Sequence, residues 1–205
     1  MKLHESLQEL RKSEKKKFDQ TVELIINLRK IDPKRDQLNL VITLPHKFKE
    51  KKVCAFLTKK STLVETITEP EFPRYKDKKE LKNLVKRYDY FIASAPLMGK
   101  VATVFGKILG PAGKMPSPQL GVLMTDDEKA IKDSLEKISK SVKIRLKEPS
   151  LKIMVGKESS KDEDIIENIK IVYSAIENAL PKKKENVRNV MIKFTMSKAI
   201  KTEVI

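Results

Sequence analysis

The sequence predicts an α/β protein of two domains, in which both ends of the 205-residue chain form one domain and the middle forms an inserted second domain. In the two flanks apolar and polar residues alternate, which is typical of strands with one buried face. In the middle, short apolar runs at 53–57 and 89–94 have few polar positions, as in parallel strands covered on both faces. We therefore expect domain I over residues 1–47 and 141–205 and domain II over residues 48–140.

The flanks predict helices and one-sided strands. Leucines at helical spacing predict a surface helix over residues 2–15. Alternation predicts strands at 21–29 and 38–44, and we expect these two strands to form an antiparallel pair across a turn at Asp32-Pro33. The C-terminal flank has the same style, with strands expected at 142–146, 151–155 and 190–195 and a helix over 165–176.

The middle of the chain alternates strands with helices. A helix is expected over residues 81–88, between the apolar runs, and Pro96 suits the first turn of another helix. A further helix is expected over residues 131–138. Strand, helix, strand and helix in this order are typical of a small parallel α/β unit.

The charge balance narrows the class of partner. The formal net charge is +16 at pH 7, and such an excess repels itself unless a polyanion neutralises it. Nucleic acid and a membrane surface are the two candidates. No apolar run approaches the roughly 20 residues of a spanning helix, and the N-terminus has no apolar signal core. We expect a cytoplasmic protein that binds nucleic acid, with no membrane partner.

The sparse cysteine and histidine residues argue against metal chemistry. Cys54 is the only cysteine and lies in an apolar run, so we expect a plain buried thiol. His4 and His46 cannot make a zinc site with one cysteine. No catalytic carboxylate pair and no nucleophile elbow can be picked out. We expect a protein that is not an enzyme and needs no metal or other cofactor.

Residues 91–125 stand apart from the rest of the chain. They contain no Asp or Glu, although charged residues make up 35% of the sequence, and they hold five of its six glycines. Glycines let backbone amides approach a ligand closely, and the only charges here are those of Lys100, Lys107 and Lys114. The segment therefore suits an anion.

A nucleotide is one candidate anion, bound by an enzyme that holds a phosphate at Gly106–Gly113. However, a P-loop needs Gly six residues before its Lys, and Ile108 stands six residues before Lys114. Met115 also replaces the Ser or Thr that binds magnesium, and the glycine spacings of four and three do not fit the dinucleotide fingerprint. This enzyme remains the alternative hypothesis. For the segment itself two interpretations stay open: an ordered connection after a helix, or a loop that contacts RNA phosphates.

Basic runs at 11–17, 47–52 and 182–184 can contact nucleic-acid phosphates, and the number of such contacts determines how strongly the affinity depends on salt. If six to ten of these cations met phosphates, binding would fall by about 10³- to 10⁵-fold between about 50 and 200 mM salt. Recognition of one RNA also needs groups that read shape, sugar hydroxyls or exposed bases.

Such groups occur at residues 17–23 and 191–198. Phe18 is an aromatic residue next to a lysine at the start of a strand, and Met196 follows the last strand, so both can pack on sugars or bases. Thr21, Thr195 and Ser197 supply hydroxyl groups in these segments, and Lys193 supplies a further positive charge. The alternative is that Phe18 and Met196 only cover an edge of the core.

At these residues the chain resembles the L-one family of large-subunit ribosomal proteins, found in the mobile stalk beside the tRNA exit site. Three segments carry the resemblance, in order. They are KFDQTVELIINLRKIDPKRDQLNLVITLPH at 17–46, ILGPAGKMPSP at 108–118, and VGKESSKDEDIIENI followed by NVRNVMIKFTMS within 155–197. They extend over nearly the whole chain, and the KMPSP string resembles archaeal members of the family.

The resemblance implies a split α/β sandwich built from both termini, with an inserted Rossmann-like second domain. It implies binding of the stalk region of large-subunit rRNA, mainly by the first domain, and help in releasing deacylated tRNA from the exit site. Members of the family often also repress translation of their own mRNA. The chain is then expected to act as a monomer within the ribosome.

Carried over position by position, the resemblance implies a set of RNA-binding residues. They are Lys17, Phe18, Thr21, Glu23, Thr195, Met196 and Ser197, with weaker additions at Arg145, Gly156, Lys157 and Asn189. Lys193, on the outward face of the last strand, is a further expected RNA-binding residue from the strand pattern itself. Secondary contacts to RNA or tRNA are expected at Lys107, Gly110, Gly113 and Lys114. Two positions depart from the family pattern: Ser197 stands where a glycine is usual, and Ala112 where an arginine is common.

Overall fold

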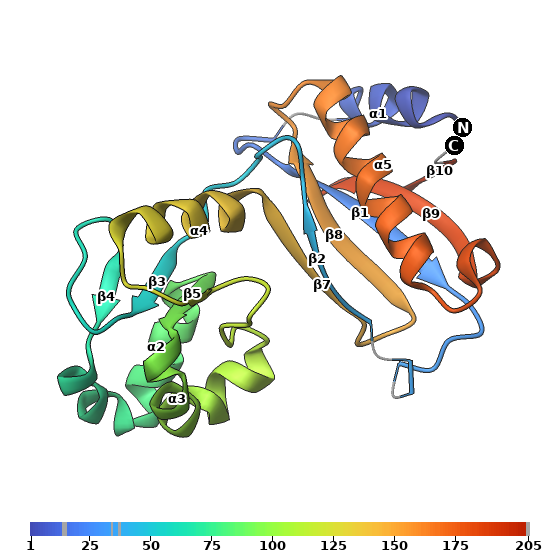
Figure 1. The fold of residues 1–205 in the computed structure, drawn as a ribbon. Coiled ribbons are helices and arrows are strands. Elements are labelled where there is room, and N and C mark those ends of the chain that lie inside the picture. Colours follow the sequence, from blue (N-terminus) through green and yellow to red (C-terminus); the bar gives the residue numbers. More distant parts are fainter. Residues whose placement is uncertain (14–15, 34, 37, 204–205) are drawn as a thin grey trace. The chain divides into compact units, whose positions relative to one another are not determined.

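The computed structural model describes residues 1–13, 16–33, 35–36 and 38–203 (Figure 1). The described residues form two antiparallel sheets, one parallel sheet and several helices, so the predicted α/β fold class is confirmed. The chain divides into two compact units: unit 1 comprises Met1–Lys49 and Lys140–Ile205, and unit 2 comprises Glu50–Ser139.

Unit 1 is built around a four-stranded antiparallel sheet in the order β10-β9-β1-β8. A separate two-stranded sheet pairs β2 with β7. The elements are α1 (Leu3–Arg11), β1 (Thr21–Leu28), β2 (Asn39–Thr43), β7 (Ser141–Arg145), β8 (Ser150–Lys157), α5 (Asp162–Ala179), the 3₁₀ helix η3 (Lys183–Asn186), β9 (Val187–Phe194) and β10 (Ile200–Thr202).

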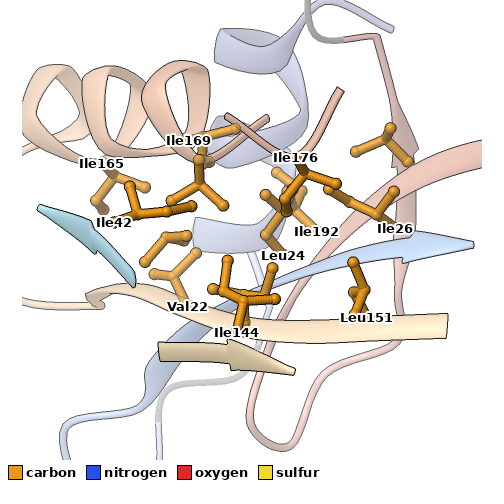
Figure 2. Close-up of a cluster of buried hydrophobic side chains, with 14 of the residues drawn as sticks. Val22, Leu24, Ile26, Ile42, Ile144, Leu151, Ile165, Ile169, Ile176 and Ile192 are labelled. Atoms are coloured by element: carbon orange, nitrogen blue, oxygen red, sulfur yellow. The ribbon is translucent and has the colours of Figure 1, made fainter. Parts of the chain in front are cut away.

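One hydrophobic core joins the sheet, the two-stranded sheet and the helices of unit 1. On β1 the alternate residues Val22, Leu24 and Ile26 are fully buried. Figure 2 shows their side chains below Ile165, Ile169 and Ile176 of α5. Alternation in the strand and helical spacing in α5 thus bring two apolar faces together, which leaves the other face of the four-stranded sheet for contacts outside the core.

One prediction for unit 1 is wrong, and one helix is shorter than expected. The strands expected at 21–29 and 38–44 exist as β1 and β2, but they do not pair with each other. Both sides of β1 are taken by the eight-residue strands β8 and β9, which come from the far end of the chain. The helix expected over 2–15 ends at Arg11, and residues 14–15 lie outside the described residues.

Unit 2 has a parallel sheet in the order β4-β3-β5-β6. The elements are β3 (Val53–Phe56), β4 (Glu65–Ile67), the 3₁₀ helix η1 (Glu69–Lys76), α2 (Lys78–Arg87), β5 (Tyr90–Ser94), the 3₁₀ helix η2 (Ala95–Leu97), α3 (Met98–Ala112), β6 (Val122–Leu123) and α4 (Glu128–Lys140).

The sheet of unit 2 is buried on both faces, as its short apolar runs predict. Cys54 and Phe56 of β3 pack in a cluster with residues of α2 and α3, and Ala55 packs in another with Ile131 and Ile138 of α4. Cys54 is fully buried, and burial raises the pKa of its thiol to about 12. The thiol therefore stays protonated at neutral pH, which confirms the prediction of a plain buried cysteine.

Candidate nucleic-acid interface

The start of β1 and the end of β9 lie side by side, although they are far apart in sequence. Val22 pairs with Phe194 and Glu23 pairs with Lys193. Just beyond the last ladder pair, the Thr21 N–H donates to Thr195 Oγ1 at 3.1 Å, and the Thr195 N–H donates to Thr21 O at 3.1 Å. We call this region the β1–β9 surface, and its residues are Lys17, Phe18, Thr21, Glu23, Lys193, Thr195, Met196 and Ser197.

Two large apolar side chains of the β1–β9 surface are exposed. Phe18 is 53% exposed and Met196 is 65% exposed, and neither belongs to a buried cluster. An exposed aromatic ring and a flexible thioether near lysines suit contact with sugars and bases.

Glu23 lies between two neighbouring strands on the face of the sheet away from the core. Lys193 is opposite it on β9 and Met154 is opposite it on β8. Within the described residues its carboxylate makes no hydrogen bond or ion pair, so its oxygens can accept from sugar hydroxyls or base amines. The ladder between β1 and β8 also contains a bulge between Val22 and Glu23, which increases the local twist.

Ser197 closes a turn at the end of β9. The Phe194 N–H donates to Ser197 Oγ at 2.9 Å, and the Ser197 N–H donates to Phe194 O at 3.1 Å. Ser197 does not have a positive φ, so the backbone here does not require the glycine usual at this position. The serine hydroxyl therefore supports the turn that presents Met196.

Lys157 of β8 also reaches the β1–β9 surface, because it pairs with Thr21. Its Nζ lies 3.3 Å from Asp19 Oδ2, and Asp19 accepts hydrogen bonds from the Ser159 N–H and Oγ at 3.1 and 2.9 Å. Burial would raise the pKa of Asp19, but these bonds and the lysine charge together lower it. Asp19 is thus ionised at neutral pH, and a phosphate would have to compete with it for Lys157.

Three further predicted residues lie elsewhere or point elsewhere. Gly156 faces the core, because an added Cβ would meet Ile165 Cγ1 at 2.8 Å. Asn189 is further along the sheet, where its Oδ1 accepts from Asn27 Nδ2 at 2.7 Å. Arg145 ends β7 in the other sheet, just before β8 begins, whereas the β1–β9 surface lies at the far end of β8. The eight residues of β8 span about 23 Å at roughly 3.3 Å per residue, so Arg145 is not part of this cluster.

The glycine-rich segment of unit 2 is largely helical rather than a loop. Gly99, Gly106 and Gly110 lie within α3, which ends at Ala112. Gly113 has a φ of 71° at the C-terminal cap, and its N–H donates to Gly110 O at 2.9 Å. Both interpretations treat the segment as a connection or loop, and this holds only after α3, between Gly113 and β6. Apolar residues at helical spacing outweigh the low helix propensity of glycine, since Val101, Phe105 and Leu109 are buried.

This geometry also weakens the nucleotide alternative. Residues 106–112 form the last turns of α3, and the C-terminal end of a helix carries a partial negative charge that disfavours phosphate. Lys114 Nζ donates to Val85 O and Tyr88 O, both at 2.7 Å, and so caps the end of α2. Of the predicted secondary contacts, Lys107 is exposed and has no partner among the described residues.

Replacing Lys114 by Met should destabilise unit 2 and leave RNA binding almost unchanged. The substitution removes two hydrogen bonds from a charged donor, which we expect to lower the free energy of unfolding by about 1–3 kcal/mol. Thermal unfolding and RNA titration of the same preparation measure the two effects, with Lys107→Met as the control. A loss of RNA affinity without a loss of stability would instead assign Lys114 to the RNA contact.

A comparison with known families places the chain. The model of the Ribosomal protein L1p/L10e family matches residues 10–198. The chain belongs to this family.

Curated relatives of this L1-family chain come from archaea, and each is named large ribosomal subunit protein uL1. The protein of Thermococcus kodakarensis is 33% identical, with 98% of this chain and 97% of the relative aligned. That of Pyrococcus horikoshii is 33% identical over 98% and 95% of the two chains, and that of Korarchaeum cryptofilum is 35% identical over 91% and 87%. The predicted resemblance to archaeal members is confirmed.

The fold of this L1-family chain also contains site residues that the sequence did not single out. Gln20 is only 2% exposed and contacts Met196, while Arg11 and Glu158 hold the neighbouring loop. Gln20 lies between the exposed residues Phe18 and Asp19 and the alternating strand β1. The local sequence there does not distinguish a buried glutamine from a solvated one. Its burial depends on strand ends more than 100 residues away, and no local pattern signals such a contact.

No helix in the described ranges has the length and apolar character needed to cross a membrane. The same residues contain no cluster of three or more His, Cys, Asp or Glu side chains that could hold a metal ion.

Proposed function

We propose that this chain is a component of the large ribosomal subunit that binds the stalk region of large-subunit rRNA through the β1–β9 surface. The observation that carries the proposal is the exposure of Phe18 and Met196 beside backbone and hydroxyl groups of Thr21 and Thr195, at a place where two remote segments of the chain meet. Membership of a ribosomal protein family supports it.

Charge supports the same partner. The net charge of +16 gives attraction to any RNA, while the exposed apolar side chains and the carboxylate of Glu23 add contacts that a simple phosphate-binding surface does not need. The Glu23 carboxylate repels phosphates. It favours RNA binding only if it accepts hydrogen bonds from sugar hydroxyls or base amines.

Binding of a stalk rRNA fragment, measured at several salt concentrations against an RNA of equal length with a scrambled sequence, tests the proposal. We expect both affinities to fall as salt rises, and the stalk fragment to stay at least about 100-fold tighter at about 150 mM salt, a difference typical of specific over non-specific binding. Equal affinity for the two RNAs would contradict the proposal.

The proposal includes two finer roles, one at the β1–β9 surface and one at a second contact. A segment of the chain's own mRNA that resembles the rRNA site would compete for the β1–β9 surface and repress translation. Release of deacylated tRNA would use a second contact, for which Lys107 is an exposed cation. Competition between the stalk fragment and each of these RNAs measures whether one site or two are involved.

The alternative function, a nucleotide-dependent enzyme, predicts that nucleotide raises the melting temperature of the protein. The proposed function predicts that the stalk fragment does so and that nucleotide does not.

A further inference from the structure

Gln20 is a buried polar residue next to the exposed Met196. It immediately precedes β1, and its side chain lies under the turn that follows β9. Its Oε1 accepts from the Met196 N–H at 3.1 Å, and its Nε2 donates to Glu158 Oε2 at 3.1 Å. One amide thus joins the turn after β9 to the loop after β8.

The chemistry of the two partners fixes the orientation of this amide. The Met196 N–H can only donate, and the Glu158 carboxyl oxygen Oε2 accepts. An amide offers one acceptor and one donor in the required order, so a single orientation of Gln20 satisfies both partners. A hydroxyl is too short to span them, and an apolar side chain would leave the Met196 N–H without this acceptor.

Glu158 is itself held from two directions. The Glu158 N–H donates to Gln20 O at 2.8 Å, so the backbone and side chain of residue 158 both contact Gln20. From α1, the Arg11 guanidinium donates to Glu158 O at 2.8 Å, to Ser160 O at 2.8 Å and to Asp162 Oδ1 at 2.7 Å. The loop after β8 is therefore a fixed support for the amide.

We propose that Gln20 is a positioning residue for RNA recognition: with Glu158 holding its amide, it fixes the backbone of Met196 and so the direction in which the Met196 side chain meets RNA. This inference rests on the proposed function of the β1–β9 surface. Gln20 is buried and does not contact RNA itself.

Replacing Gln20 by Leu tests the proposal. We expect the affinity of the folded variant for the stalk rRNA fragment to fall about five- to twentyfold, while the slope of affinity against salt stays unchanged because no phosphate contact is lost. The Met196 amide should also exchange its hydrogen faster. Gln8→Leu, an exposed glutamine on α1, is the matched control and should change neither.

A reversal of the pair separates positioning from general stability. Gln20→Glu alone places two carboxylates together and should weaken both folding and RNA binding. Combined with Glu158→Gln, it restores an acceptor for Met196 and a donor between the two side chains, so affinity should return to within about twofold of wild type. If Gln20 had only a structural role, the folded fraction of the Gln20→Glu variant would bind the stalk fragment as tightly as wild type. The double variant would then recover stability alone, with no affinity to recover.

Coupling to Met196→Ala distinguishes the failure of this inference from that of the proposed function. If Gln20 acts through Met196, Gln20→Leu should weaken binding much less in the Met196→Ala background. If Met196→Ala weakens binding but folded Gln20→Leu stays within twofold of wild type, the positioning role is overturned. If Met196→Ala itself has no effect, the assignment of the RNA surface fails.

Discussion

Thr195→Val combined with Met196→Ala should lower the affinity for the stalk rRNA fragment by about 30- to 100-fold, a loss of roughly 2–3 kcal/mol. Met196 is 65% exposed, so its truncation removes contact area without opening a cavity. Val keeps the shape of Thr195 but removes its hydroxyl, which accepts from the Thr21 N–H and lies on the β1–β9 surface. Titration at fixed salt measures the loss, and circular dichroism reports folding.

The matched control for this variant is Met124→Ala. Met124 is 86% exposed but belongs to unit 2, so its truncation removes a comparable apolar group away from the β1–β9 surface. We expect this control to keep wild-type affinity. If the double variant stays within about twofold of wild type, which is under 0.5 kcal/mol, the site assignment is wrong.

Gly121→Ala should be the most damaging small substitution in unit 2. Gly121 has a φ of 115°, and an added Cβ would lie 2.8 Å from the backbone oxygen of Phe91, which cannot move aside as a side chain could. The Gly121 carbonyl also accepts from the Ala93 N–H at 2.7 Å, so the two segments are held close together. We expect a loss of about 2–4 kcal/mol in the free energy of unfolding of unit 2.

Gly106→Ala serves as the control, because nothing lies within 4 Å of its added Cβ and the residue is helical. It should stabilise α3 by about 0.5–1 kcal/mol. Thermal unfolding gives both values. RNA affinity should be unchanged in both variants while the protein is folded, and a loss in Gly121→Ala like that of the Thr195 and Met196 variant would show that unit 2 takes part in the RNA surface.

Local patterns in the sequence predict most elements of this fold but not their pairing. The alternation of Val22, Leu24 and Ile26 is enough to identify β1 and its buried face. The choice of β8 and β9 as its neighbours depends on burying α5 against the completed sheet, which is a property of the whole chain. The sequence therefore suggested a local hairpin where the structure has long-range pairs.

The candidate site divides in the same way. Phe18 and Met196 can be singled out in the sequence because each is a large apolar residue at the end of a predicted strand, Phe18 next to Lys17 and Met196 between Thr195 and Ser197. The helix-capping role of Lys114 has no sign in the sequence, since its two carbonyl acceptors come from the end of α2 and only the fold brings them within reach. The burial of Gln20 has no sign in the sequence for the same reason, because its partners Glu158 and Met196 come from the ends of two other strands.

The position of β1 within its sheet has a consequence for synthesis of the chain. β1 emerges early, but both neighbouring strands follow the whole of unit 2, and Thr21 meets a partner 174 residues later. Unit 2 has all its strands before β8 is made, whereas β1 has to wait for nearly the last residues of the polypeptide. A chain that terminates before the end of β9 therefore lacks the second half of the β1–β9 surface, so this surface is complete only when almost the whole chain has been made.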